Sequence, residues 1–575
     1  MAYLRFNNII LQKKGLKTKK FTINNIEYFF IGDFYNILFD NKLYKLTELK
    51  HLLNKYSIET ILCNSIGKFF VIKKNKNNIE IFNSFSFAGL YFIKEKEKFY
   101  FATNEKEILK KIKNIKISKN FIHFYLNAHR QISYLPLNGI DQRVSRLPSG
   151  MSLLINNKNQ YKYNLYSRNN TYFYNKNFLV YNKIFSNIFN SYKKNIKKKI
   201  TILFSGGMDS TVLIAKAIEN KINFDSVYFN RAMKLNICEM MVKYLSKKFK
   251  FKSKIVEMQN EKLNENNFNK NKKLKSHYNI IGSIKELVYQ NNYDKNKIFM
   301  SGQNADTLYY VDTFAPNTYI ISFNRLLGIL KSIHLRFFYT NFFLKIITNN
   351  FFLKLLMIDK NQFFKKKIEN LIFSYDEHVS WINLPKKNNK DYFLTNRKKY
   401  FLNPFLKLLK IKNFDNLNQK DLYRILISVK WLRFVVNTHL YFNELGVFHK
   451  SKFITPFSEG PMVNYFSNNH VDLKEIFSIK PFQKKIIKNI LGFNFLFKQI
   501  SLRLSVLFTK KYRTILKNNS NNIKVDKNLK LINLFLLRKL KKHKLKYDKF
   551  LNIKKFNINQ KIRFLNFLIF FSKIK

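Results

Sequence analysis

Residues 202–211 read Ile202-Leu203-Phe204-Ser205-Gly206-Gly207-Met208-Asp209-Ser210-Thr211, and this stretch decides the fold class. The run Lys199–Phe204 has the pattern of a buried parallel strand, and the spacing after it predicts a helix from Ser210 to Glu219. Glycines let the backbone approach an anion closely, and the free N–H groups at a helix start face that anion. The stretch therefore predicts a phosphate-binding loop between a strand and a helix.

The chemistry of this loop predicts both its ligands and a metal. It is not a Walker loop, because Gly-Lys-Ser/Thr is missing. A carboxylate beside phosphates needs a cation, so Asp209 is predicted to bind Mg²⁺. An ordinary glycine-rich turn is the alternative, and a chain with 14 glycines disfavours it. The predicted nucleotide contacts of the loop are Leu203, Ser205, Gly206, Gly207, Asp209, Ser210 and Thr211.

A second motif, Ser301-Gly302-Gln303-Asn304-Ala305-Asp306-Thr307-Leu308, follows a predicted strand at Lys297–Met300. Ligands of parallel sheets bind at the carboxyl ends of the strands. We therefore expect Ser301, Gly302 and Asp306 to complete the phosphate site, with Asp306 as a second Mg²⁺ ligand opposite Asp209.

The pattern around these motifs predicts a mixed α/β protein. Strands at Asp225–Phe229 and Lys252–Glu257 alternate with helical patterns at 236–250 and 279–291, which is typical of a doubly wound parallel sheet. Residues 1–165 contain short strand-like runs separated by polar turns, which indicates a layered antiparallel sheet domain. The predicted division is a sheet domain at 1–165, a linker or helix at 166–197, an ATP-binding domain at 198–505 and a basic, mainly helical extension at 506–575. The Asn- and Tyr-rich segment 156–176, which spans the first boundary, is expected to be irregular.

Composition excludes several classes of protein. The formal charge of +70 accompanies inflated Lys, Asn, Ile, Phe and Tyr along the whole chain, so we attribute it to codon bias and expect no specific nucleic-acid role. Weak, salt-sensitive binding to polyanions is still expected. Two cysteines, Cys63 and Cys238, allow neither a disulfide framework nor a zinc site and are expected to be buried free thiols. Neither a signal peptide nor a membrane span is predicted, and we expect a cytoplasmic protein.

The order of motifs resembles the asparagine synthetase family of the ATP-pyrophosphatase superfamily, which includes β-lactam synthetase and the lasso-peptide cyclases. The resemblance covers roughly residues 25–500. Besides the loop and the Ser301–Leu308 motif, it is carried by Gly67–Ile72, Gly89–Phe92, Phe101–Glu105, Val144–Met151 and Ile454-Thr455-Pro456-Phe457.

This resemblance implies a reaction and a fold. The first domain would be amidotransferase-like, and the second would use ATP and Mg²⁺ to activate a carboxylate as an acyl-adenylate, which an amine then attacks. Glutamine-using members carry cysteine at position 2, where this chain has Ala2, so glutaminase activity is expected to be absent. Cys63 lies in mid-domain without an α-amine and is not a substitute.

Other departures concern the synthetase motif. Gln303 stands where the family has a glutamate implicated in handling the amine, Asn304 replaces a glycine and Thr307 replaces an acid. These changes favour an amine or a carboxylate different from those of asparagine synthesis. The family's catalytic lysine follows a basic helix that Pro481–Leu491 resembles, and Lys498 is the nearest match; we expect it to stabilise charge at the reacting groups.

The expected partners are a small-molecule or peptide carboxylate and an amine, with ammonia allowed, and a homodimer is compatible with the resemblance. Three alternatives stay open at this point. They are a tRNA-modifying ligase with the same loop, a non-catalytic scaffold derived from a synthetase, and a membrane-surface protein that uses basic helices.

Overall fold

The structure is a computed structural model of the 575-residue chain. The structure describes residues 3–6, 9–12, 16–116, 139–175, 177–230, 237–257, 294–305, 308, 439, 442, 446, 450–467, 480–495 and 498.

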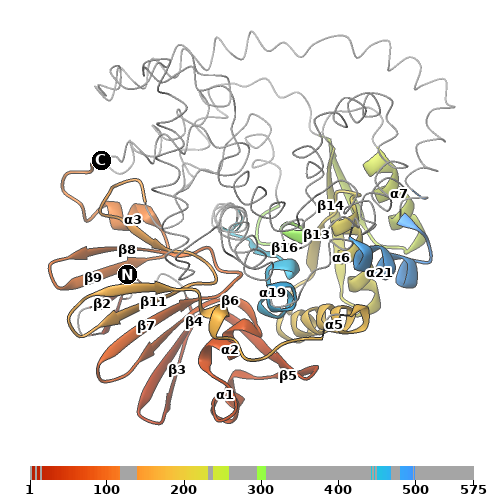
Figure 1. Cartoon of the computed structure of the whole chain (residues 1–575). Coiled ribbons are helices and arrows are strands. Elements are labelled where there is room, and N and C mark those ends of the chain that lie inside the picture. The colour runs from red at the N-terminus through yellow and green to blue at the C-terminus, as the bar shows by residue number, and fades with distance from the viewer. Residues whose placement is uncertain are drawn as a thin grey trace, which may run out of the picture.

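The first region of the chain forms two antiparallel-type sheets that face each other, as the orange and red strands of Figure 1 show. One sheet has the order β1-β2-β9-β8-β10, in which β2 and β9 run parallel. Its strands are β1 (Tyr3–Phe6), β2 (Ile9–Gln12), β8 (Leu90–Glu95), β9 (Lys98–Ala102) and β10 (Ser145–Leu147).

The second sheet has the order β12-β11-β7-β6-β4-β3, and β5 pairs with β4 at the far end of that strand. Its strands are β3 (Thr18–Ile23), β4 (Ile26–Phe39), β5 (Lys42–Tyr44), β6 (Ser65–Lys74), β7 (Asn78–Asn83), β11 (Ser152–Asn156) and β12 (Tyr161–Asn164). The helical elements of the region are η1 (Leu46–Glu48), α1 (Leu49–Leu53), α2 (Ile58–Cys63), α3 (Glu105–Leu109) and η2 (Tyr166–Asn169).

Aromatic side chains hold the two sheets together. The Phe92 ring lies 5.5 Å from that of Tyr161 and 6.3 Å from that of Tyr163, so β8 of one sheet contacts β12 of the other. Aromatic rings bury large apolar areas and favour edge-to-face contacts of this kind. The strand β12 lies inside the segment 156–176 that the sequence predicted to be irregular, and that prediction was wrong there because the polar strand is stabilised by pairing with β11.

Helix α5 (Phe178–Asn195) connects the two regions. It begins at Asn177, whose side-chain oxygen accepts the Val180 N–H, and its apolar face is buried at Tyr181, Ile184, Phe185, Ile188 and Phe189. The helix packs against β4 of the first region and α6 of the second, so the predicted linker is a structural element.

The second region contains a five-stranded, all-parallel sheet with the order β15-β14-β13-β16-β17. Its strands are β13 (Ile200–Leu203), β14 (Phe224–Asn230), β15 (Ser253–Glu257), β16 (Ile298–Ser301) and β17 (Lys452–Ile454). Its helical elements are α6 (Met208–Glu219), α7 (Ile237–Lys248), η7 (Pro456–Ser458), α19 (Gly460–Ser467) and α21 (Pro481–Leu491). The mixed α/β prediction is confirmed, with this Rossmann-like sheet after an antiparallel region.

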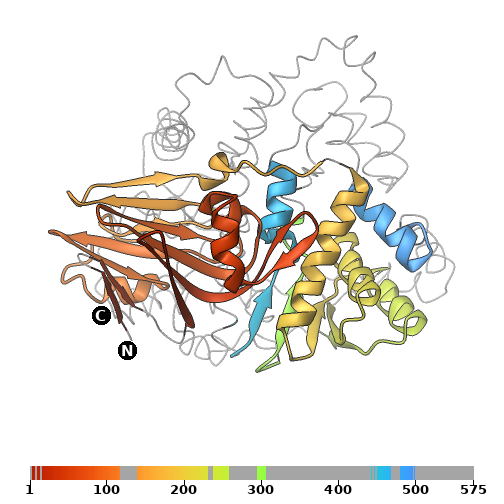
Figure 2. The ribbon, with the colours of Figure 1, turned by 90° about the horizontal axis from the view of Figure 1, so that it is seen from below.

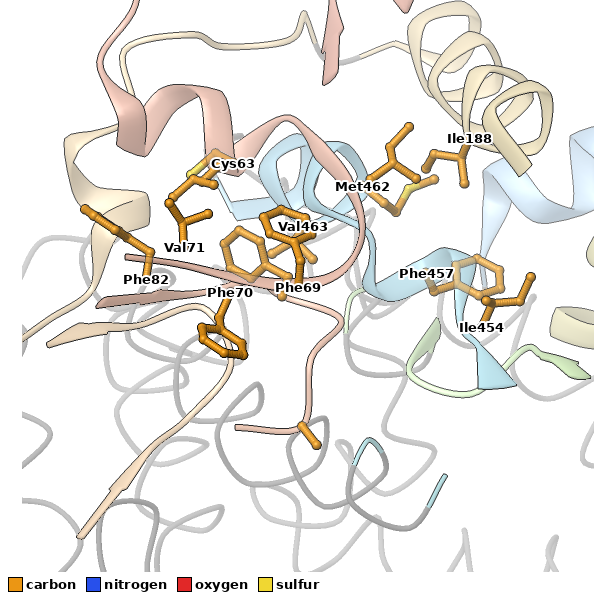
Figure 3. Packing of buried hydrophobic residues seen from close by; sticks show 14 of the residues in the cluster. Cys63, Phe69, Phe70, Val71, Phe82, Ile188, Ile454, Phe457, Met462 and Val463 are labelled. Carbon is orange, nitrogen blue, oxygen red and sulfur yellow. The ribbon is translucent and has the colours of Figure 1, made fainter. Parts of the chain in front are cut away.

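One hydrophobic core runs through both regions. Figure 3 shows Phe69 of β6 beside Val463 of α19 and Met462 of α19 beside Ile188 of α5, with Phe457 and Ile454 continuing toward the parallel sheet. Figure 2 shows the same junction from below, with α5 crossing between the two sheet systems. The regions are thus packed as one body along this junction.

A buried carboxylate also joins the regions. Glu459, between η7 and α19, accepts the Gly67 N–H of β6 at 2.8 Å and the Tyr192 hydroxyl of α5 at 2.7 Å. Burial raises the pKa of this carboxyl above its usual value, although these hydrogen bonds oppose the shift.

Several predicted features lie outside the described residues. They are the helical pattern at 279–291, most of the region after 320, Asp306, Thr307, Ala2 and the extension 506–575. In the part of the chain that is described, no helix combines the length and hydrophobicity required to cross a bilayer.

Candidate functional site

The predicted phosphate loop lies at the point where the strand order of the parallel sheet reverses. The chain adds β14 and β15 on one side of β13, and then β16 and β17 on the other side. At such a switch point the connections leave the carboxyl edge in opposite directions and open a crevice in which ligands bind. The loop after β13 and the turn after β16 occupy this edge, because β13 pairs with β16 in the register Leu203 to Ser301. Figure 1 shows the two strands side by side, with α6 following β13.

Glycine is required where the loop turns. Gly206 has φ +70°, a left-handed conformation, and a Cβ atom at this position would come 2.3 Å from the Cys238 carbonyl oxygen. Gly302 on the neighbouring turn is less constrained, since its Cβ would lie 3.1 Å from the Asp209 side chain. The two glycines thus bring the loop, the start of α7 and the second turn into close contact.

The hydroxyl groups of the loop hold its shape. Ser205 Oγ lies 3.0 Å from Ser210 Oγ, and Ser210 donates to the Gly207 carbonyl at 3.0 Å. Thr211 donates to the same carbonyl at 2.8 Å and is fully buried. Ser205 is exposed, so its hydroxyl is the one that reaches the crevice directly. The buried hydroxyls of Ser210 and Thr211 position the start of α6, whose N-cap is Gly207.

An ion pair occupies the centre of the site. Lys480 Nζ lies 2.5 Å and 2.6 Å from the two carboxylate oxygens of Asp209. The Lys480 side chain is 8% exposed and that of Asp209 is 22% exposed, so the pair is mostly shielded from water. Lys480 precedes Pro481 at the start of α21 and has a left-handed backbone conformation with φ +48°. Non-glycine residues rarely adopt this conformation, and its presence beside a predicted ligand is typical of functional sites.

The second motif begins as predicted. Ser301 ends β16, its Oγ accepts the Gln303 N–H at 3.3 Å, and the Gln303 residue is exposed. Asn304 adopts φ +74°, a left-handed conformation that asparagine tolerates better than most residues. Its amide donates to Ser458 Oγ at 2.7 Å, which ties this turn to the end of β17. Asp306 lies outside the described residues, so its predicted meeting with Asp209 stays a prediction.

Lys498 lies away from the loop. Its ammonium group sits 3.8 Å from the centre of the Tyr244 ring on α7. Tyr244 is six residues along α7 from Cys238, the residue that contacts Gly206, and six residues of helix span about 9 Å. The lysine that contacts the loop is instead Lys480, which directly precedes helix α21, whereas Lys498 follows that helix. Lys480 was not predicted, because lysine is common in this chain. The one local signal is its position directly before Pro481, at a helix start.

A buried polar group lies behind the second turn. His439 Nε2 is 3.4 Å from Thr455 Oγ1 and 3.5 Å from Asn304 Nδ2. Burial, and then the charges of Lys68 and Arg146, hold the pKa of His439 well below its usual value. The imidazole is therefore neutral near pH 7, and it supports the turn without adding a charge.

The loop fits phosphates better than it fits a metal alone. The start of α6 presents backbone N–H groups beside the exposed Ser205 hydroxyl. Both oxygens of Asp209, however, already contact an ammonium group. Within the described ranges, His, Cys, Asp and Glu side chains do not gather in any group of three that could hold a metal. Binding of Mg²⁺ to Asp209 would require Lys480 to move.

Both cysteines are free thiols, but the prediction that both are buried is confirmed for Cys63 only. Cys63 lies in the core at 1% exposure, and burial raises the pKa of its thiol far above the usual value. Such a thiol is a poor nucleophile, because the reactive thiolate is disfavoured. Cys238 is half-buried at the start of α7.

The chain matches no known protein-family model, and no curated protein matches it significantly.

Proposed function

We propose that this chain forms amide bonds at the expense of ATP. A substrate carboxylate oxygen would attack the α-phosphorus, the bond to pyrophosphate would break, and an acyl-adenylate would result. The nitrogen of an amine would then attack the acyl carbon, AMP would leave with the electron pair of the broken C–O bond, and the amine would lose one proton. The family resemblance of the motifs suggests this reaction class.

One observation supports the proposal above the others. Two glycine-containing turns, from neighbouring parallel strands, meet at the switch point of the sheet with a buried lysine between them and α21. This arrangement combines backbone N–H donors, a hydroxyl at Ser205 and the positive charge of Lys480 at one edge. Such a set of groups suits the polyphosphate of a nucleotide.

Each residue of the site would have a separate role. The backbone N–H groups from Gly206 onward and the Ser205 hydroxyl would bind pyrophosphate oxygens, and Gly302 would let the second turn pack against the start of α6. Bound Mg·ATP would supply the activated phosphorus and a good leaving group. Lys480 would exchange Asp209 for the phosphates and stabilise the charge that develops on pyrophosphate as it leaves. Asp209 would then be able to hold the metal, together with Asp306 as the resemblance implies.

The first region would be structural in this scheme. Its only described cysteine is the inert Cys63, and position 2 is alanine, so ammonia would not be produced from glutamine here. The region covers the junction behind β17 and α19 and keeps the synthetase site in place.

A scaffold without catalysis is the second candidate, and the Asp209–Lys480 pair gives it a specific basis. An ammonium group that contacts both oxygens of Asp209 is also what a site without a metal would retain. The two functions differ in whether Lys480 leaves Asp209 when a nucleotide is present.

The test is ATP–[³²P]pyrophosphate exchange by the full chain against a panel of carboxylates that includes aspartate. We expect one carboxylate to support exchange, and Asp209→Asn to abolish it. Asp294→Asn is the matched control, since it removes an exposed acid from the same region, where it pairs with Lys254. Absence of exchange with every acid, together with absence of ATP binding, would reject the synthetase and leave the scaffold.

A further inference from the structure

A lysine-lined cleft of about 420 Å³ lies at the edge of the parallel sheet opposite to the phosphate loop. Its lining includes Ile298 and Lys452, which are the first residues of β16 and β17, and Lys198, two residues before β13. These positions mark the amino-terminal edge of the sheet, whereas Ser205 and Gly302 follow its carboxyl edge. Strands of four residues separate the two edges by about 13 Å. The cleft is therefore a separate site, between the parallel sheet and strand β4.

The charge of this cleft exceeds what composition predicts. Seven of its 17 lining residues are lysines, against 105 Lys and Arg in 575 residues of the chain. They come from four separate segments that only the fold brings together. The seven are Lys17, Lys19, Lys197, Lys198, Lys297, Lys450 and Lys452.

Acidic residues do not balance these charges. Asp33 is the single carboxylate of the lining, and it already pairs with Lys452 at 2.7 Å. Within the described parts of the chain, no carboxylate lies within 4.0 Å of the other six lysines. Like charges that converge without counter-charges repel each other, so a bound anion would stabilise the arrangement. Next to the cleft, burial and the charge of Lys452 lower the pKa of Lys68 to about 8, against the opposing effects of Glu459 and Asp33.

The apolar lining residues lie mainly beneath the lysines. Phe30 and Leu46 are only 2% and 4% exposed, and Phe34 packs edge-on against Phe30 with 5.3 Å between the ring centres. The half-buried Phe34 and Tyr35 offer the remaining aromatic surface, so the lysines would supply most contacts to a ligand.

We propose that this cleft binds a small, multiply charged phosphate compound of nucleotide size. The volume lies toward the lower end of the range for small-molecule sites, which favours such a compound over a folded polymer. This proposal does not depend on the reaction at the Ser205–Ser210 loop, because no residue is shared between the two sites.

The experiment titrates inorganic tripolyphosphate into the full chain by calorimetry, at about 50 mM and 200 mM salt. The test variant is Lys19→Gln/Lys198→Gln/Lys450→Gln, which removes one charge from each of three lining segments. The control variant is Lys50→Gln/Lys55→Gln/Lys98→Gln, which removes the same charge from exposed lysines of the first region. Any binding at the phosphate loop is common to both variants.

We expect the test variant to bind tripolyphosphate about 10-fold more weakly or worse, and the control to stay within about 2-fold of the parent chain. Lysine acetylation read by mass spectrometry gives a second readout on the unaltered chain: tripolyphosphate should protect the lining lysines and leave Lys50 and Lys55 reactive. Equal weakening in both variants, or uniform protection, would show a diffuse surface effect and overturn the proposal. Binding of an RNA of about 20 nucleotides that is 100-fold tighter and is lost in the test variant would also overturn it, in favour of a nucleic-acid groove.

Discussion

Replacing Lys480 by methionine removes the ammonium group that contacts both oxygens of Asp209. Methionine keeps the length of the side chain, so the packing at the start of α21 is preserved. Loss of one partner from a fully buried ion pair costs about 3–5 kcal/mol, because the remaining charge is left without compensation. Asp209 is 22% exposed and can recover part of this through water, so we expect the free energy of unfolding to fall by about 2–3 kcal/mol.

The assay is a double-mutant cycle of Lys480→Met, Asp209→Asn and their combination, followed by urea unfolding and by hydrogen exchange of peptides from α6 and α21. Hydrogen exchange localises the effect in a chain whose regions need not unfold in one step. A coupling energy of about 2 kcal/mol is expected, since the double variant removes both sides of the Lys480–Asp209 contact at once. Lys488→Met, on the exposed side of the same helix, is the matched control and should change stability by less than about 0.5 kcal/mol.

The cycle has a second expected result with a divalent cation. Mn²⁺ in the absence of nucleotide should stabilise Lys480→Met more than the parent chain, because in the parent chain the Lys480 ammonium group contacts both oxygens of Asp209. A Lys480→Met stability equal to that of Lys488→Met, or a coupling energy near zero, would refute the assignment of Lys480 to the site. If Mn²⁺ stabilised the parent chain as much as the variant, the proposal that Lys480 must leave Asp209 before a metal binds there would be refuted.

Three further predictions follow from the geometry. Gly206→Ala should weaken ATP binding by at least about 10-fold in calorimetry, since residue 206 has φ +70° and the new Cβ would meet the Cys238 carbonyl. The control Gly207→Ala, whose Cβ has its nearest contact at 3.2 Å, should bind ATP within a few-fold of the parent chain. Equal affinities of the two variants would contradict the close approach at Gly206. The pKa of Lys68 is lowered from 10.5 to about 8 in the folded chain. Between these two pH values the unfolded chain keeps a proton on Lys68 that the folded chain loses. Stability relative to Lys68→Met should therefore rise by up to about 2 kcal/mol between pH 8 and pH 10, measured by urea unfolding, and a flat difference would show a normal amine. Iodoacetamide should label Cys238 faster than Cys63 in the native chain, as read by mass spectrometry, because the Cys63 thiol is buried with a raised pKa; labelling of Cys63 first would contradict the packing of α2.

Local pattern was sufficient to predict the strands and the loop. A run such as Ile200–Leu203 followed by Ser-Gly-Gly has few alternatives, because hydrophobic periodicity and glycine both act over a few residues. The observed β13, β14, β15 and β16 lie within one or two residues of the predicted strands. The left-handed geometry of Asn304 was also predictable, because few residue types tolerate it.

Contacts between distant segments were not predictable in the same way. Lys480 and Asp209 are 271 residues apart, and no local pattern distinguishes this lysine from the many others in the chain. The strand β12 has a polar sequence and forms because β11 offers it a partner. Tertiary pairing outweighs local propensity in such cases.

The hydrogen bonds of Glu459 bear on how this protein can be dissected experimentally. A gene fragment that starts at residue 198 would encode the whole parallel sheet but would lack both Gly67 and Tyr192, the donors that hold this carboxylate. Its side chain would then be ionised against a freshly exposed aromatic surface at Phe457, whose partner Phe185 would also be missing. Such a truncation is expected to aggregate whatever its catalytic competence. Domain boundaries drawn from motifs are therefore poor cloning boundaries here, and point variants in the intact chain are the sound way to assign roles.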